Sequence, residues 1–129
     1  MMLDTTALID ILRGNPDIGT TLIELEKKNV ALTLTSVSVF ELWQGIADLN
    51  NKEKSDKIHF LLESLGIFLL DVPSAQEAGS IHATLKKEGR IIDPEDSMIA
   101  GIAKVHHETI LTRNVKHFER IPELQVKTY

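Results

Sequence analysis

The sequence has no cysteine, no long hydrophobic run and no excess of basic charge. Without cysteine, the chain cannot form a disulfide framework, a Cys-ligated zinc site, an iron–sulfur cluster or a thiol nucleophile. Apolar runs such as residues 67–70 are far shorter than the roughly 20 residues that a membrane-spanning helix needs, so we expect no membrane partner. The net charge of -5 argues against a protein that coats nucleic acid through bulk electrostatics. Any contact with nucleic acid must then be local.

What is present is the composition of a globular protein. The chain has 129 residues, of which 43% are hydrophobic and 26% are charged. This length is close to the commonest size of one domain, so we predict a single domain over residues 1–129. The sequence begins Met-Met-Leu-Asp, without the charged region and apolar stretch of an export signal. We therefore expect a cytoplasmic location.

Short β-rich runs alternate with longer helical patterns along the chain. Strands are predicted at residues 1–4, 30–35, 67–72, 109–112 and 125–129. We expect the strand at 67–72 to be buried and the strand at 125–129 to lie at a sheet edge. Helices are predicted through Ala7–Ile11, over 17–28, from Ser36 past Ile46, over 54–65, from a capping box at Ser74–Glu77 to near Gly89, and from Asp93 to His106. This alternation predicts an α/β fold, a three-layer α/β/α sandwich with a mostly parallel sheet of about five short strands and helices on both faces.

Three acidic residues fall near the predicted carboxyl ends of strands, where ligands collect in open α/β sheets. Asp4 ends the first strand, Glu41 lies one turn into the helix after the second strand, and Asp96 lies in the first turn of a later helix. Each acid could also have a purely structural role. Asp4 and Asp96 suit a helix N-terminus, and Glu41 could lie on a solvated helix face. Asp93 also suits a helix N-terminus, and we interpret it as a cap.

Convergence of these acids would favour a bound cation. Two carboxylates ~4 Å apart repel by ~4 kcal/mol at an effective dielectric constant near 20, so three would not share a pocket unaided. Because the sequence has no cysteine and its histidines are not paired at metal-ligand spacing, the oxygen-rich set favours Mg²⁺ or Mn²⁺ over Zn²⁺. We assign histidine no catalytic role, and we place Trp43 in the core because it lies on an apolar helix stripe. Metal-dependent phosphodiester hydrolysis is the chemistry that such a site supports.

Four segments together resemble the PIN-domain ribonucleases, and among them most closely the VapC toxins of toxin–antitoxin pairs. They are MMLDTTALIDILRG, TSVSVFELWQGI, GRIIDPEDSMIAGIA and ILTRNVKHFERIPELQVKTY. The resemblance spans the whole chain in the same order and at similar spacing. It implies a PIN-like fold and a metal-dependent endoribonuclease.

The resemblance also implies roles for individual residues. Asp4 and Asp96 would bind Mg²⁺, with Mn²⁺ as a substitute, and Glu41 would position the metal or the attacking water. Asn114 matches the polar residue of the family's T-x-N segment and completes the catalytic set. The family often has a fourth acid near the Phe of this segment, whereas this chain has Asn114 and His117 there and no Asp. We therefore expect one tightly bound ion.

The resemblance implies three partners: an RNA substrate such as tRNA or rRNA, a VapB-like antitoxin, and a second copy of the chain in a homodimer. Contacts to RNA are assigned to Thr112, Arg113 and Lys116. Exposed apolar residues for the protein interfaces are expected at Ile11, Leu12 and Ile18.

Two other functions compete with this one. A catalytically idle PIN-like module that binds RNA or protein would be indicated by a lost acid, and the three main acids are present. A phosphatase could use Asp4 as its nucleophile. The turn that follows, Asp4-Thr5-Thr6, lacks the second Asp two residues on, so this alternative ranks low.

Overall fold

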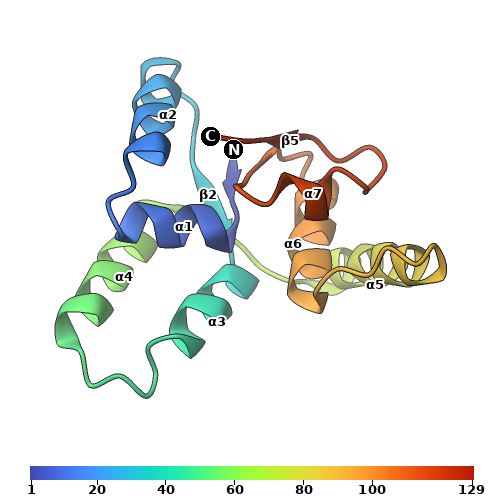
Figure 1. The fold of residues 1–129 in the computed structure, drawn as a ribbon, viewed down its shortest axis with the longest axis horizontal. Helices are drawn as coiled ribbons and strands as arrows, with labels where there is room; N and C mark the ends of the chain where they lie inside the picture. The colour runs from blue at the N-terminus through green and yellow to red at the C-terminus, as the bar shows by residue number, and fades with distance from the viewer.

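The computed structural model describes residues 1–129 and contains five short strands in one sheet (Figure 1). The strands are β1 (Met2–Leu3), β2 (Thr33–Thr35), β3 (Gly66–Phe68), β4 (Ile110–Leu111) and β5 (Val126–Lys127). Their order across the sheet is β3-β2-β1-β4-β5, and all four pairings are parallel. The predicted α/β class with a parallel sheet of about five strands is confirmed, although each strand is shorter than predicted.

Seven helices cover the sheet. They are α1 (Thr5–Leu12), α2 (Pro16–Lys27), α3 (Ser36–Gln44), α4 (Lys52–Ser64), α5 (Val72–Lys87), α6 (Pro94–Val105) and α7 (Val115–Phe118). In Figure 1, α1, α2 and α4 lie to one side of the strands, and α5, α6 and α7 lie to the other. No helix combines the length and the apolar character needed to cross a membrane.

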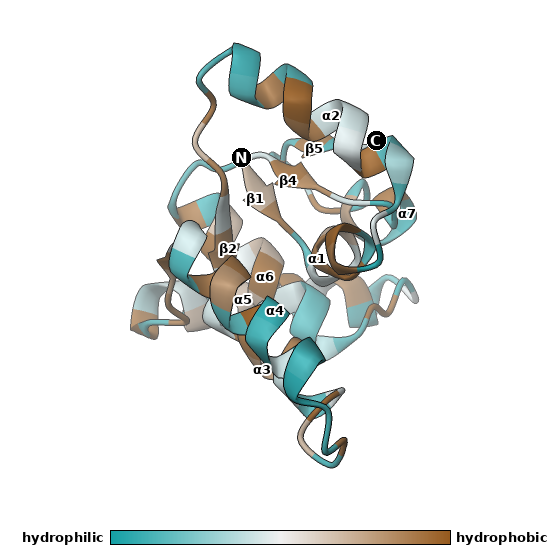
Figure 2. Ribbon diagram, turned by 90° about the vertical axis from the view of Figure 1, so that its left-hand side faces the viewer, coloured by the Kyte–Doolittle hydropathy of each residue, from teal (hydrophilic) through white to brown (hydrophobic).

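The sheet separates two hydrophobic cores because successive residues of a strand face opposite sides. Met2 and Ile110 pack into one core with residues of α5, α6 and α7. Their neighbours Leu3 and Leu111 pack into the other core with residues of α1, α2 and α4. Figure 2 shows the central strands and α1 coloured mainly as hydrophobic, whereas α4 presents much hydrophilic surface. This arrangement is the predicted three-layer sandwich.

The start of α3 differs from the prediction by one residue. Thr35, not Ser36, caps the helix, because its hydroxyl accepts the Ser38 N–H at 3.0 Å. Ser36 is the first helical residue, and its hydroxyl accepts the Leu70 N–H at 3.1 Å. Either hydroxyl suits an N-cap. The sequence alone therefore does not decide between them, and the contact of Ser36 with the segment at Leu70 is a tertiary feature.

The predicted capping box at Ser74–Glu77 is wrong. Helix α5 begins at Val72, and the cap is Asp71, whose Oδ1 accepts the Ser74 N–H at 3.0 Å. Proline is tolerated in the first helical turn, so Pro73 does not exclude an earlier start. Glu77 instead forms an ion pair with Lys104 of α6 at 2.7 Å.

Three burial predictions are also wrong. Strand β3 lies at a sheet edge, so it has a strand neighbour on one side only, and Ile67 is 43% exposed. Trp43 is 39% exposed and meets His59 edge to face, because α3 turns Val37 and Leu42 toward the two cores instead. Ile18, expected at an interface, is only 1% exposed.

Close approach of α5 and α6 generates a stability prediction. A Cβ added to Gly101 of α6 would lie 2.6 Å from the backbone of Ser74 and Ala78 in α5. We expect Gly101→Ala to lower the free energy of unfolding by about 1–3 kcal/mol, because two backbones must separate. Gly79→Ala is the matched control: it meets nothing within 4 Å and should stabilise α5 by about 0.5–1 kcal/mol through helix propensity.

Urea denaturation of the two variants measures both changes. A Gly101→Ala protein as stable as the wild type would contradict the close packing of α5 on α6.

Candidate active site

The carboxyl ends of β1 and β4 lie side by side at one edge of the sheet. Strand β1 pairs with β2 on one side and with β4 on the other. The chain adds β2 and β3 in one direction and then returns across β1 to add β4 and β5. Ligands of open α/β sheets bind at such a reversal of strand order. Asp4 directly follows β1, and Thr112 directly follows β4.

Asp4 is 2% exposed, and its carboxylate is held by three donors. Oδ1 accepts the Ala7 N–H at 2.9 Å, so Asp4 caps α1 and the capping alternative is confirmed. The Thr6 hydroxyl donates to the same carboxylate at 2.8 Å. Capping does not explain the third donor, the hydroxyl of Thr112, which follows β4 and donates to Oδ2 at 2.6 Å.

Glu41 and Asp96 each have one oxygen held by a neighbouring side chain. Glu41, half-buried on α3, accepts a hydrogen bond at Oε2 from the Thr5 hydroxyl. Asp96 lies in the first turn of α6, and its Oδ2 is 2.8 Å from Nδ1 of His117 on α7. No protein donor reaches Oε1 of Glu41 or Oδ1 of Asp96.

The three predicted acids lie within electrostatic reach of one another. Each has a pKa above its ordinary value, and burial is the largest cause for all three. The charge of Asp96 further raises the pKa of Asp4 and of Glu41, and the charge of Asp4 raises that of Glu41. Hydrogen bonds from Thr112, Thr5 and His117 lower these pKa values without cancelling the increase.

The raised pKa values have a consequence for stability. A carboxyl whose pKa is higher in the folded state stabilises the fold below its unfolded pKa, near 4, and this contribution is lost as the pH rises through the folded value. Ionisation of these acids in the folded protein therefore opposes folding. A cation among them would offset that repulsion.

The donor set fits a hard divalent cation that keeps part of its water shell. No three His, Asp or Glu side chains are arranged to hold an ion by protein ligands alone. Mg²⁺ does not need such a cage, because it is usually bound by one or two carboxylates and several waters. The unpartnered oxygens of Glu41 and Asp96 are available for direct or water-mediated ligation.

The residues predicted to contact RNA have different surroundings. Thr112 is fully buried, so it cannot meet a substrate, and it holds Asp4 instead. Arg113 is half-exposed, but its Nη1 donates to Asp10 at 3.1 Å. Asn114, which precedes α7, and Lys116, within α7, are both exposed.

Sequence reasoning missed two features of this region. His117 contacts Asp96. In the sequence, the only indication was that the final segment has a His and no Asp near Phe118. Asp10, 2% exposed on α1, accepts the Tyr129 hydroxyl at 2.7 Å as well as Arg113. In the sequence, Asp10 stood out as an acid within an otherwise apolar helical pattern.

Asp93 occupies the N-cap position of α6 as predicted, although its side chain makes no capping hydrogen bond.

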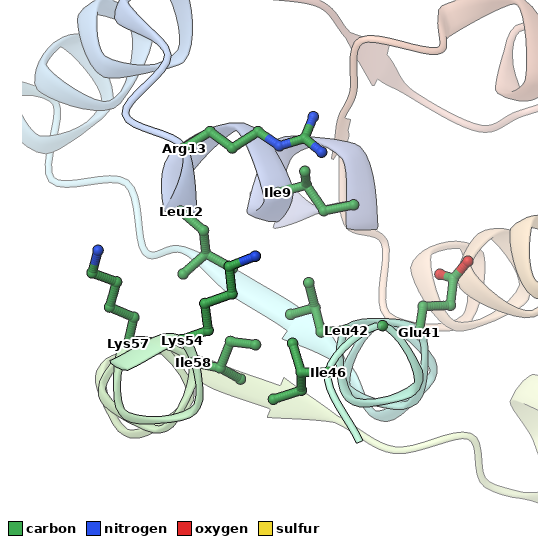
Figure 3. Close-up of a pocket in the computed structure, with 10 residues that line it drawn as sticks. Ile9, Leu12, Arg13, Glu41, Leu42, Ile46, Lys54, Lys57 and Ile58 are labelled. Atoms are coloured by element: carbon green, nitrogen blue, oxygen red, sulfur yellow. The ribbon is translucent and has the colours of Figure 1, made fainter. Parts of the chain in front are cut away.

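An apolar groove of about 300 Å³ lies between α1, α3 and α4 (Figure 3). Its apolar side chains point toward one another from the three helices and from the turn that follows α3; they are Ile9, Leu12, Leu42, Ile46 and Ile58. Arg13, Lys54 and Lys57 also line it. Figure 3 shows the Glu41 carboxylate pointing away from the apolar centre, so the groove adjoins the acidic site without containing it.

The fold and the acids together define an α/β protein with an acidic ligand site at the switch point of a parallel sheet. The chain matches the PIN domain over residues 1–124. It is 30% identical over 129 residues to ribonuclease VapC2 of Rickettsia felis, and the alignment covers 99% of this chain and 96% of the relative. It is 28% identical to the tRNA(fMet)-specific endonuclease VapC of Shigella flexneri, over 99% and 96% of the two chains.

Solved structures agree with these relationships. The crystal structure of VapBC2 from Rickettsia felis bound to a promoter DNA fragment has a chain that superposes with a TM-score of 0.88 and 29% identity, covering 99% of this chain and 97% of that one. The chain therefore belongs to the PIN-domain family, in its group of VapC ribonucleases.

The chain's one tyrosine allows the network beside the site to be tested by titration. Burial, followed by the hydrogen bond to Asp10 and the charge of Asp10, raises the pKa of Tyr129 well above the ordinary value of 10.0. Its contribution to stability is thus present below pH 10 and is lost as the pH rises through the folded pKa. We expect no phenolate absorbance near pH 10 while circular dichroism remains native.

Replacing Asp10 by Asn removes the charge and should move the Tyr129 titration toward the ordinary value. Tyrosine ionisation near pH 10 in a folded wild-type protein would show that the hydroxyl does not bind Asp10.

Proposed function

We propose that the protein is a metal-dependent endoribonuclease and the toxin of a VapBC-type pair. The observation that carries this proposal is the gathering of Asp4, Glu41 and Asp96 at the switch point, with all three pKa values raised. Membership of the PIN-domain family and the ribonuclease names of the relatives support it. Asp4, Glu41, Asp96 and Asn114 form the proposed catalytic set.

The three acids have two proposed roles. Asp4 and Asp96 would hold the cation, directly or through water. When bound, a divalent cation would neutralise charge that develops on a scissile phosphate and would activate water. Glu41 uses its unpartnered Oε1 to orient the attacking water and to accept its proton, which suits a half-buried carboxylate with a raised pKa. Asn114, exposed after β4, contacts the RNA.

Mg²⁺ is the proposed physiological ion, with Mn²⁺ as a substitute. All three acidic side chains offer oxygen ligands, which suit these hard cations better than Zn²⁺. The unpartnered oxygens lie on Glu41 and Asp96, whereas both oxygens of Asp4 already accept hydrogen bonds. The Thr6 hydroxyl, which contacts both oxygens of Asp4, can give up one of these contacts to a ligand.

The proposed substrate is a structured RNA such as tRNA or rRNA. The net charge of -5 requires local attraction for phosphates, and the exposed Lys116 supplies it beside the acids, with the half-exposed Arg113 next to it. The proposed protein partners are a VapB-like antitoxin and a second copy of the chain, because several similar structures are VapBC complexes. Analytical ultracentrifugation of the isolated chain measures the homodimer.

RNA cleavage by the purified, antitoxin-free protein tests the activity. We expect discrete fragments of total cellular RNA with Mg²⁺, and none after addition of EDTA. Asp4→Asn and Asp96→Asn should each reduce cleavage by at least about 100-fold, since each removes a charge that holds the ion. Fragments are resolved by gel electrophoresis and mapped by sequencing.

Circular dichroism must show that both variants are folded, and Glu63→Gln, on the exposed surface of α4, is the matched charge-loss control. Equal cleavage by wild type, both Asn variants and the EDTA-treated sample would reject the metal-dependent nuclease. A wild type that binds RNA without cutting any would favour the idle module.

Thermal unfolding tests the ion independently of RNA. At pH 7.5, saturating Mg²⁺ or Mn²⁺ should raise the Tm of the wild type by about 3 °C or more, because the ion binds the folded state and offsets the ionised acids. The increase should largely disappear in Asp96→Asn. A Tm that responds equally in wild type and Asp96→Asn would place the bound ion elsewhere.

A further inference from the structure

His117 makes the one protein hydrogen bond that the Asp96 carboxylate receives. Its Nδ1 lies 2.8 Å from Oδ2 of Asp96, across 21 residues of sequence. The Asp96 side chain is 19% exposed, whereas that of His117 is 43% exposed. The contact is thus made at the boundary between the acidic site and solvent.

The position of His117 is set by buried neighbours. Helix α7 has four residues, and its last residue, Phe118, is fully buried in the core beside α6. The preceding turn is held by the Asn114 N–H, which donates to the Thr112 hydroxyl at 2.8 Å, and by the His117 N–H, which donates to the Asn114 carbonyl at 3.0 Å. An otherwise exposed imidazole is therefore presented to Asp96 by a short, anchored segment.

The chemistry of this contact determines where the imidazole proton lies. An ionised carboxylate only accepts hydrogen bonds, so Nδ1 must carry the proton and donate it. Oδ2 of Asp96 then has one of its two lone pairs engaged, whereas Oδ1 has no protein partner and is the more open oxygen for a ligand. Hydrogen-bonded neighbours of metal-ligating carboxylates orient them in this way.

We propose that His117 is a positioning residue of the metal site, which orients Asp96 so that Oδ1 faces the divalent cation. The inference rests on the metal-dependent function proposed above. It assigns His117 no contact with the reacting atoms and no proton transfer. It predicts that removing the imidazole weakens metal binding while the fold and the three acids stay in place.

Isothermal titration calorimetry with Mn²⁺ alone tests this role without RNA. We expect His117→Ala to raise the Kd for Mn²⁺ by about 10–100-fold, the usual loss when such a neighbour is removed. His117→Asn keeps an N–H donor close to the position of Nδ1 and should stay within about 3-fold of the wild type. His59→Ala, on the exposed surface of α4, is the matched histidine control and should not change the Kd.

Nitrogen NMR of the metal-free protein provides a second readout. The neutral His117 ring should carry its proton on Nδ1 in the wild type, and this preference should weaken in Asp96→Asn. A merely structural histidine could share this coupling to Asp96, but its replacement by Ala would leave the Kd for Mn²⁺ unchanged and would give Asn nothing to rescue.

The outcomes separate the two proposals. A wild type that binds Mn²⁺ and a folded His117→Ala variant that binds it equally well would overturn the positioning role alone. Protonation on Nε2 in the neutral ring would overturn it too. A wild type with no Mn²⁺ binding at all would overturn the metal-dependent function, and the inference about His117 with it.

Discussion

The hydrogen bond from the Thr112 hydroxyl to the Asp4 carboxylate joins the ends of two neighbouring parallel strands, and the site depends on it. The two residues are 108 positions apart in the chain, both are buried, and the bond is 2.6 Å long. Because β1 and β4 are paired in parallel, their carboxyl ends meet at one edge of the sheet. The final segment with Asn114 and His117 leaves β4 at this point, so it begins beside Asp4.

The same edge gathers charges that oppose folding. Burial and mutual repulsion raise the pKa values of Asp4, Glu41 and Asp96 together. Threonine and histidine donors offset part of this cost, yet they leave one oxygen of Glu41 and one of Asp96 without a partner. Acids with raised pKa values are typical of functional sites, and the free oxygens of Glu41 and Asp96 suit a cation ligand.

A second charged network uses part of the positive charge that lies beside the acidic site. Asp10 is buried on α1 and is shared by the Arg113 guanidinium and the Tyr129 hydroxyl. The backbone N–H of Arg113 also donates to Thr6, which in turn donates to Asp4. Asp10 and Arg113 together therefore link the end of the chain to the acidic site. Lys116, exposed on α7, provides further positive charge nearby.

The sequence by itself determined the alternation of strands and helices, and with it the three-layer fold and the acids Asp4, Glu41 and Asp96. Periodicity and strand ends are local properties that a linear pattern records. Tertiary structure alone decided that Thr112 is buried under Asp4, that Trp43 faces solvent, and that His117 and Asp10 have charged or polar partners. These features depend on which helix face meets the sheet and on contacts across 21 to 119 residues, which no spacing within one segment encodes.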